Sequence, residues 1–133
     1  MRKSVTLAAI ALLLGACATQ PGARPVATAV KPARPDLRSQ TVRMTLPPDA
    51  RTVGDAAEYL LEGSGYSLVL FCKQCPKAAP RLAAEPVSPL AFARPNEITS
   101  ATRALLLILG ERRRLIVDDQ LRLVTFDRIG AGL

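Results

Sequence analysis

Between Thr41 and Phe126 the apolar side chains recur with two different periods, which predict strands and helices in alternation. Residues 41–46 alternate polar and apolar positions, as a half-buried strand does. Residues 66–71 form a short apolar run, which predicts a second strand. Between them, five apolar residues fall at i, i+3, i+4, i+7 and i+8 and form one face of a helix: Val53, Ala56, Ala57, Leu60 and Leu61.

Polar and glycine residues mark the ends of this first helix. Thr52 is a favourable N-cap, and Asp55, three residues later, completes a capping-box-like pair. Gly63 supplies the left-handed conformation that ends many helices. The same kind of pattern predicts a second helix over residues 99–109, just before Gly110. Its apolar face consists of Ala101, Ala104, Leu105, Ile108 and Leu109.

Leu106 and Leu107 lie off the apolar face of the second helix. The C-terminal half of that helix is therefore apolar nearly all round. Such a helix is either covered from more than one side or presents an apolar patch to a partner protein.

The last two predicted strands form the clearest hairpin in the chain. Residues 114–117 and 121–126 are rich in apolar side chains, and residues 118–120 form the turn between them. Five prolines precede the second helix, so regular structure is not expected there, except for a short edge strand at residues 89–94. The predicted order is β-α-β-(β)-α-β-β. This is a small α+β domain over residues 41–128, with two helices packed on small sheets.

The chain begins in the way that a secreted protein does. A basic head at residues 1–4 precedes an apolar run and a small-residue exit, which is the layout of a signal peptide over residues 1–16. The run is shorter than the roughly 20 residues that span a bilayer. The exit Leu-Gly-Ala-Cys, which ends at Cys17, resembles the lipobox of bacterial lipoproteins; cleavage by a general signal peptidase is the alternative. The resemblance implies that Cys17 carries the lipid and that Ala18 permits transport to the outer membrane.

Composition separates a tether from the domain. Residues 17–40 contain four prolines among Ala, Thr and Gln, which favours an extended, disordered tether, and residues 129–133 form a short tail. The formal net charge is +7, but residues 46–133 hold 11 basic and 10 acidic side chains, so the excess lies elsewhere. The basic tether either lies against an anionic membrane surface or is a solvated linker.

The side chains that bind nucleic acid or perform catalysis are scarce. The chain has no His, no Trp and five other aromatic residues, which argues against stacking platforms for single-stranded nucleic acid. The basic cluster at residues 112–114 is typical of a solvated turn, so we expect no nucleic-acid partner. Without His the commonest general base is missing, and the hairpin turn accounts for the acidic pair at 118–119. We expect no catalytic site, no cofactor and no small-molecule substrate.

Cys72 and Cys75 form a Cys-x-x-Cys pair after the second predicted strand. A structural zinc site needs four ligands, and with no His these two thiols supply only half of them. A redox-active dithiol sits at a helix N-terminus, whereas Pro76 and Pro80 argue against a helix here. An oxidising compartment favours a closed disulfide. The sequence therefore favours a structural disulfide, with free or partner-linked thiols and a redox centre as the alternatives.

Several segments of the domain resemble one known family. The stretches TVGDAAEYLL at 52–61 and GSGYSL at 63–68 resemble the PilL amino-terminal domain of integrating conjugative elements and thin (type IV) pilus operons. Residues 89–95, 104–110 and 115–126 are similar to the same family. The insert at Cys72–Pro80 departs from it. More distantly, the layout is similar to the STN-like amino-terminal domain of secretins and TonB-dependent receptors, and to the lipoprotein DotD.

The resemblance implies a domain of two helices packed with small sheets that docks proteins and has no enzymatic role. We therefore expect an outer-membrane lipoprotein, anchored by its lipid and facing the periplasm, in a conjugation, pilus or secretion apparatus. Its expected partners are a secretin-like or channel subunit, or further copies of itself.

The expected contact is an exposed strand edge at residues 121–126, through strand addition. The residues assigned to it are Leu121, Arg122, Leu123 and Val124, together with the surplus Leu106 and Leu107. One alternative function is a periplasmic thiol-disulfide factor that uses Cys72 and Cys75. Another is a ligand-binding module for peptidoglycan or pilin, for which the sequence offers no named site.

Overall fold

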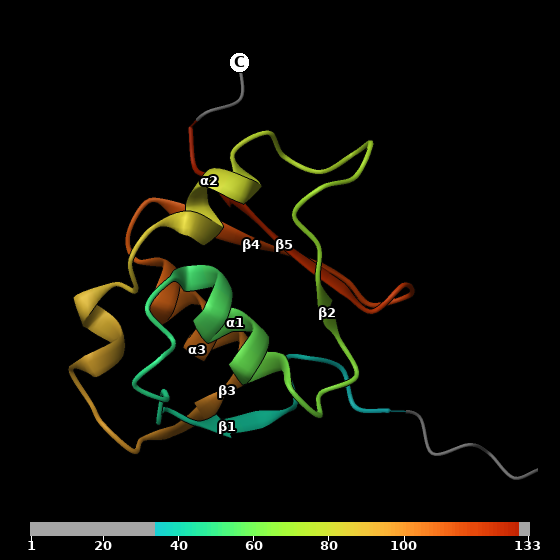
Figure 1. The fold of residues 1–133 in the computed structure, drawn as a ribbon. Coiled ribbons are helices and arrows are strands. Elements are labelled where there is room, and N and C mark those ends of the chain that lie inside the picture. Colours follow the sequence, from blue (N-terminus) through green and yellow to red (C-terminus); the bar gives the residue numbers. More distant parts are fainter. Residues whose placement is uncertain (1–33, 131–133) are drawn as a thin grey trace, which may run out of the picture. The chain divides into compact units, whose positions relative to one another are not determined.

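The computed structural model describes residues 34–130 (Figure 1) and confirms the α+β class, with three helices and two small sheets. The predicted signal peptide at 1–16, Cys17, most of the predicted tether and the last three residues lie outside the described residues. The elements are β1 (Thr41–Arg43), α1 (Val53–Leu61), β2 (Ser67–Leu68), α2 (Ala79–Ala84), the 3-10 helix η1 (Pro89–Phe92), β3 (Ile98–Ser100), α3 (Ala101–Leu109), β4 (Arg113–Asp118) and β5 (Leu123–Arg128).

The two sheets lie on either side of a pair of helices. β1 and β3 form an antiparallel two-stranded sheet, and the second sheet has the order β2-β5-β4. In that sheet β5 is parallel to β2 and antiparallel to β4. Figure 1 shows α1 and α3 packed together between the sheets, and α2 beside the three-stranded one.

The two long helices form where the apolar period predicts them. The Thr52–Asp55 capping box is present: the Asp55 N–H donates to the Thr52 hydroxyl (3.2 Å), and the Thr52 N–H donates to the Asp55 carboxylate (3.1 Å). All five predicted face residues of α1 and all five of α3 are buried. α3 begins two residues later than expected, because Ser100 is its N-cap and its hydroxyl accepts from the Arg103 N–H (3.2 Å).

The core lies between the helices and the inner face of the three-stranded sheet. Its largest fully buried side chains are Phe126, Leu37, Leu82, Leu105, Ile108, Leu109, Val53 and Val124. Each fully buried aliphatic or aromatic side chain of this size stabilises the fold by about 1.5–3 kcal/mol. Phe126 and Val124 both come from β5, the middle strand of this sheet.

The sequence predicts little regular structure in the five-proline region before the second long helix, and this prediction is wrong. Residues 79–84 form the helix α2, and residues 89–92 form a 3-10 turn rather than an edge strand. Pro80 and Pro89 lie in the first turns of these helices, where a missing N–H removes no intrahelical hydrogen bond. Ser88 caps η1 by accepting from the Leu90 N–H (3.3 Å).

Four strands also differ from the prediction. β1 ends at Arg43 instead of continuing to residue 46, and β2 is limited to Ser67–Leu68. β3 includes residues 99 and 100, which were predicted to begin the second helix; they form a strand because β1 lies beside them and pairs with them. β5 begins at Leu123 because Arg122 has a left-handed backbone conformation (φ 57°) in the turn.

Candidate interaction surfaces

The strand that the sequence assigned to partner binding is not an edge strand. β5 is hydrogen-bonded to β4 on one side and to β2 on the other. The Ser67 N–H donates to the Arg122 carbonyl (3.0 Å), and the Val69 N–H donates to the Val124 carbonyl (2.8 Å). The side chain of Val124 is fully buried. The prediction of an exposed edge at residues 121–126 is therefore wrong, because pairing with β2 could not be read from the local pattern.

The other residues assigned to that contact are found in several different environments. Leu121 is 67% exposed in the hairpin turn, whereas Leu123 is half-buried. Leu106 is 42% exposed on α3, and Leu107 packs against the core. Arg122 is engaged within the domain. The structure does not bring these residues together into one surface.

The hairpin strand with an open edge is β4. Its partner strand lies on one side, and the Ile129 N–H donates to the Arg112 carbonyl (3.0 Å). In an antiparallel ladder, hydrogen-bonded and non-hydrogen-bonded residue pairs alternate along the strands. Arg112 and Ile129 form a hydrogen-bonded pair, so Leu115 and Val117 belong to non-hydrogen-bonded pairs and their backbone N–H and C=O groups point away from β5. In the part of the chain that the structure describes, no hydrogen bond from outside the hairpin reaches the backbone of either residue.

The side chains of β4 alternate between the two faces of the sheet. Leu115 and Val117 point inward and pack against the core. Arg114, Ile116 and Asp118 point outward and are exposed. The outer face of this edge therefore carries a cation, an apolar side chain and an anion in succession.

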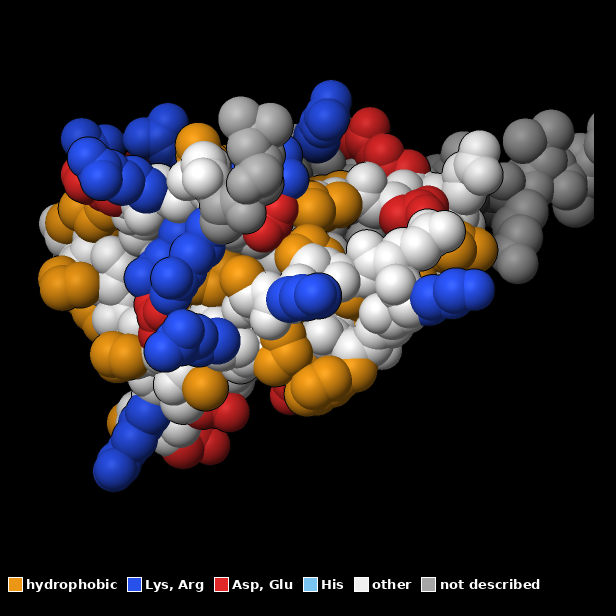
Figure 2. Space-filling view, turned by 90° about the horizontal axis from the view of Figure 1, so that it is seen from above, with side chains coloured by type: hydrophobic (Ala, Val, Ile, Leu, Met, Phe, Trp, Pro, Cys, Tyr) orange, Lys and Arg blue, Asp and Glu red, His pale blue; other side chains and the backbone are white. Residues whose placement is uncertain are grey.

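A second surface lies around η1 and the start of β3 and is apolar. Leu90, Phe92 and Ile98 are 45%, 60% and 61% exposed. Three of the nine exposed large apolar side chains among the described residues thus fall within nine positions of the chain. Figure 2 shows apolar side chains gathered at the end of the molecule that η1 occupies in Figure 1. We call Leu90, Phe92 and Ile98 the apolar end. The sequence does not predict this surface, because residues 89–94 are expected to form an edge strand rather than the 3-10 turn that exposes Leu90 and Phe92.

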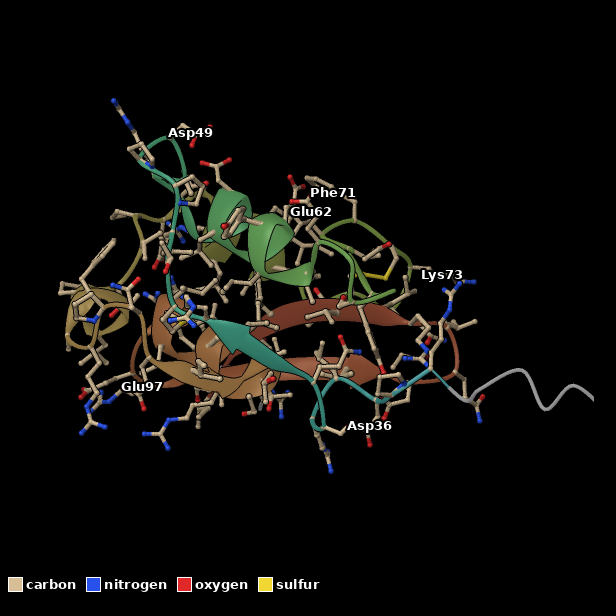
Figure 3. All side chains as sticks on the ribbon, turned by 90° about the horizontal axis from the view of Figure 1, so that it is seen from below. Asp36, Asp49, Glu62, Phe71, Lys73 and Glu97 are labelled. Atoms are coloured by element: carbon tan, nitrogen blue, oxygen red, sulfur yellow. A yellow bond between two sulfur atoms is a disulfide. The ribbon has the colours of Figure 1, made fainter. Side chains whose placement is uncertain are left out.

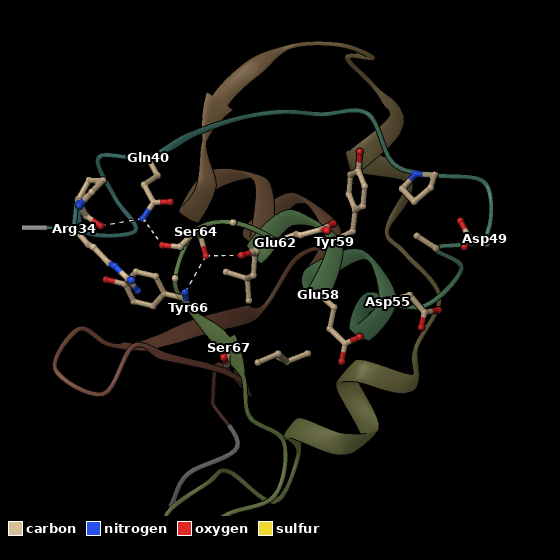
Figure 4. Close-up of a pocket in the computed structure, with 17 residues that line it drawn as sticks. Arg34, Gln40, Asp49, Asp55, Glu58, Tyr59, Glu62, Ser64, Tyr66 and Ser67 are labelled. Carbon is tan, nitrogen blue, oxygen red and sulfur yellow. Dashed lines mark hydrogen bonds between the residues drawn. The ribbon is translucent and has the colours of Figure 1, made fainter.

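A groove of about 1160 Å³ runs along the outer side of α1 (Figure 4). Four carboxylates line it: Asp49, Asp55, Glu58 and Glu62. Asp55 already takes part in the capping box of α1, and the hydrogen bonds from Thr52 lower the pKa of its carboxyl. No three His, Cys, Asp or Glu side chains within residues 34–130 are grouped in a way that could hold a metal ion.

Residues 34–40, which the sequence assigned to the tether, are part of the folded domain; we call them the strap. Leu37 is fully buried. The Leu37 N–H donates to the Tyr66 hydroxyl (3.2 Å), which donates in turn to the Asp119 carboxylate (2.6 Å). The folded domain therefore begins before Thr41, the predicted boundary. The composition of the strap is typical of a disordered segment, but burial of a single leucine holds it against the domain.

Arg122 holds the strap from the other side. Its guanidinium donates to the carbonyls of Pro35 (2.9 Å) and Arg34 (2.7 Å) and lies over the Tyr66 ring at 4.8 Å. Gln40 adds bonds to the carbonyls of Pro35 (2.9 Å) and Ser64 (3.1 Å), which are drawn in Figure 4. Burial, followed by the bond to Asp119, raises the pKa of Tyr66. Arg122 is thus a structural residue and not part of a docking strand.

Cys72 and Cys75 are joined by a disulfide in the loop after β2, with their Cα atoms 4.9 Å apart (Figure 3). The expectation that prolines exclude a helix after this pair is wrong, because α2 follows. However, α2 begins at Ala79, four residues beyond Cys75. A redox-active dithiol lies directly at a helix N-terminus, and the position of this pair along the chain differs from that arrangement.

The basic cluster at 112–114 is only partly a solvated turn. Glu85, just after α2, forms ion pairs with Arg113 and Arg128 (3.2 Å for the latter), and Arg113 also donates to the Leu109 carbonyl (2.6 Å). Arg114 pairs with Asp127 on β5 (2.5 Å). The Glu85 contacts tie the C-terminal end of α2 to one end of the hairpin, and the Arg114–Asp127 pair joins its two strands.

No helix among residues 34–130 is long and apolar enough to cross a membrane. A comparison with protein-family models, with curated proteins and with solved structures found no match for this chain.

Proposed function

We propose that this chain is a periplasmic lipoprotein, anchored in the outer membrane through Cys17, that acts as a protein-docking subunit of a conjugation, type IV pilus or secretion apparatus. The apolar end is the observation that carries the proposal. An exposed patch with a large aromatic side chain is typical of protein interfaces, and Phe92 is suited to anchor one. The lipobox-like sequence and the resemblance to the PilL amino-terminal domain support the location and the apparatus.

The proposed role requires no chemistry from the domain. A lipid at Cys17 would hold the chain at the membrane, the residues before the strap would span the distance to the domain, and the domain would supply the docking surface. A secretin-like or channel subunit of the same envelope apparatus is the proposed partner. The apolar end, rather than the predicted strand at 121–126, is the proposed contact.

A photo-crosslinking amino acid placed at position 92 of the full-length protein in its native cells tests the docking role. We expect it to capture one subunit of an envelope transport or pilus apparatus, identified by mass spectrometry. Position 71 is the matched control, because Phe71 is also an exposed phenylalanine (81%) but lies in the disulfide loop. The same products from both positions, or a product unrelated to such an apparatus, would overturn the proposal.

The anchor is tested separately at Cys17. A Cys17→Ser chain should lose incorporation of labelled palmitate and move from the membrane fraction to the soluble periplasmic fraction, because one or more acyl chains provide the membrane affinity. Wild-type protein that carries no label would refute the lipid anchor while leaving the docking surface to be judged by the crosslinks.

A further inference from the structure

We propose that two copies of this chain pair through their β4 strands, antiparallel and about a two-fold axis, to form one continuous sheet of six strands. The open edge of β4 is the site, and its occupant is the β4 of a second copy. The proposal does not depend on the docking role of the apolar end, which lies on other elements.

Burial on the two faces of β4 restricts how two copies can pair. In an antiparallel ladder, side chains directly opposite one another lie on the same face of the sheet. Leu115 and Val117 face the core and Ile116 faces outward. A shift of one residue would place core side chains opposite outward ones. Inward residues must therefore oppose inward residues, and outward residues must oppose outward ones.

Charge selects one register among those that remain. When Ile116 lies opposite Ile116 of the second copy, Arg114 lies opposite Asp118 of that copy, and Leu115 lies opposite its Val117. Opposite charges and apolar side chains are then matched at every position. Moving one copy by two residues would place Ile116 opposite Arg114 or Asp118 and would lose both ion pairs. The edge is thus complementary to itself in one arrangement.

The open backbone groups agree with this register. The N–H and C=O groups of Leu115 and Val117 point away from β5, so each Leu115 can exchange two hydrogen bonds with Val117 of the second copy. The central Ile116 residues then form a non-hydrogen-bonded pair, in which Cα atoms are about 4.5 Å apart and side chains are closest.

The two charged side chains keep atoms available for the second copy. Arg114 uses its Nε and Nη2 groups on Asp127, so Nη1 is not required there. Asp118 accepts from the Gln120 and Leu121 N–H groups through Oδ1 (2.9 Å each), so Oδ2 is not required in the turn. Pairing would therefore add contacts without breaking those that hold the hairpin.

Cysteine crosslinking in the membranes of cells that express the full-length protein tests the pairing. In an Ile116→Cys chain the two new thiols would meet at the two-fold axis. We expect an oxidant to give a dimer on a non-reducing gel, and a reductant to reverse it. Ile129→Cys is the matched control, since Ile129 is more exposed (63%) but lies off the edge, and wild-type protein controls for the native cysteines.

Three outcomes would overturn the proposal. The Ile116→Cys chain could fail to crosslink, it could crosslink no better than Ile129→Cys, or it could link to a different protein. The last result would assign the edge to strand addition by another partner. Co-expressed Arg114→Cys and Asp118→Cys chains with different tags test the register: each should link to the other and neither to itself.

A charge at the centre of the interface gives an independent measurement. The Ile116→Lys substitution places two like charges opposite each other but adds no strain to the monomer, because the side chain points outward. Light scattering of the purified, detergent-solubilised chain should give a dimer for wild type and for Ile129→Lys, and a monomer for Ile116→Lys with unchanged circular dichroism. The wild-type protein should be measured at two concentrations about 100-fold apart. If it is monomeric at both, the inference is contradicted.

Discussion

At the scale of single residues, a few side chains decide which segments belong to the fold. Leu37 is the clearest case, because it is fully buried although proline-rich sequence surrounds it. Tyr66, Asp119 and Arg122 hold the strap around it through two hydrogen bonds of the tyrosine hydroxyl and a stacked guanidinium. The strap therefore fixes the point at which the chain enters the domain.

The Leu37→Ala substitution should lower the free energy of unfolding by about 2–5 kcal/mol, because it leaves a cavity at a fully buried position. Urea denaturation followed by circular dichroism measures the difference. Leu121→Ala is the matched control: that leucine is 67% exposed, so its loss should cost less than about 0.5 kcal/mol. Equal effects of the two substitutions would mean that the strap does not contribute to the fold.

Tyr66 should make the stability depend on pH in the alkaline range. Burial and the Asp119 hydrogen bond raise its pKa in the folded state above the usual value of about 10. The folded chain therefore holds this proton more tightly than the unfolded chain does. The resulting stabilisation is complete below about pH 10 and is lost as the pH rises through the raised pKa.

The Tyr66→Phe substitution tests this dependence. It should remove the alkaline loss of stability that Tyr66 causes, and at pH 7 it should cost about 1–3 kcal/mol because Asp119 and the Leu37 N–H lose their partner. Tyr59→Phe is the control for a tyrosine outside this network. Parallel stability curves for wild type and Tyr66→Phe between pH 8 and 11 would show that the predicted linkage is absent.

At the scale of elements, caps and turns decide where each helix and strand ends. The capping box sets the start of α1, and prolines in first turns permit α2 and η1. Gly110 ends α3 with φ 85° and ψ −168°, a combination that is essentially restricted to glycine. A Cβ at this position would lie 3.1 Å from the Ser88 hydroxyl oxygen, so the turn is tight as well as strained.

The Gly110→Ala substitution should destabilise the domain by more than about 1 kcal/mol, through the backbone conformation and the contact with Ser88. Gly63→Ala is the matched control, because Gly63 also has a positive φ (74°) but has no atoms within 4 Å of the added Cβ. Thermal unfolding of both chains measures the difference. A smaller loss at position 110 than at position 63 would contradict this account of the α3 terminus.

At the scale of the whole molecule, two small sheets enclose a pair of helices, and we propose that two exposed surfaces bind partners. These are the apolar end and the open edge of β4. The disulfide between Cys72 and Cys75 lies in the loop after β2, apart from both surfaces in the chain. Its sequence separation of only three residues means that it restricts the unfolded chain little.

The Cys72→Ser/Cys75→Ser double substitution should therefore lower the stability by less than about 2 kcal/mol. It should leave the Phe92 crosslink and the activity of the envelope apparatus unchanged, because the proposed role does not use thiol chemistry. Loss of activity with an intact fold would favour the thiol-disulfide alternative. Titration of the unreduced wild-type protein should find no free thiols at these positions.

The local sequence was enough to predict the elements whose pattern is local: α1, α3, the β4–β5 hairpin and the α+β class. Helical period and caps act over three or four residues, and a hairpin joins neighbouring segments. Tertiary structure alone decided that β5 is central, since its partner β2 comes from 56 residues earlier in the chain. It also decided that the strap is folded and that Arg122 serves the domain. The Leu37 N–H reaches the Tyr66 hydroxyl 29 residues away, and the Arg122 contacts join positions 87 or 88 residues apart. The local pattern of apolar and polar residues does not predict contacts between such distant positions.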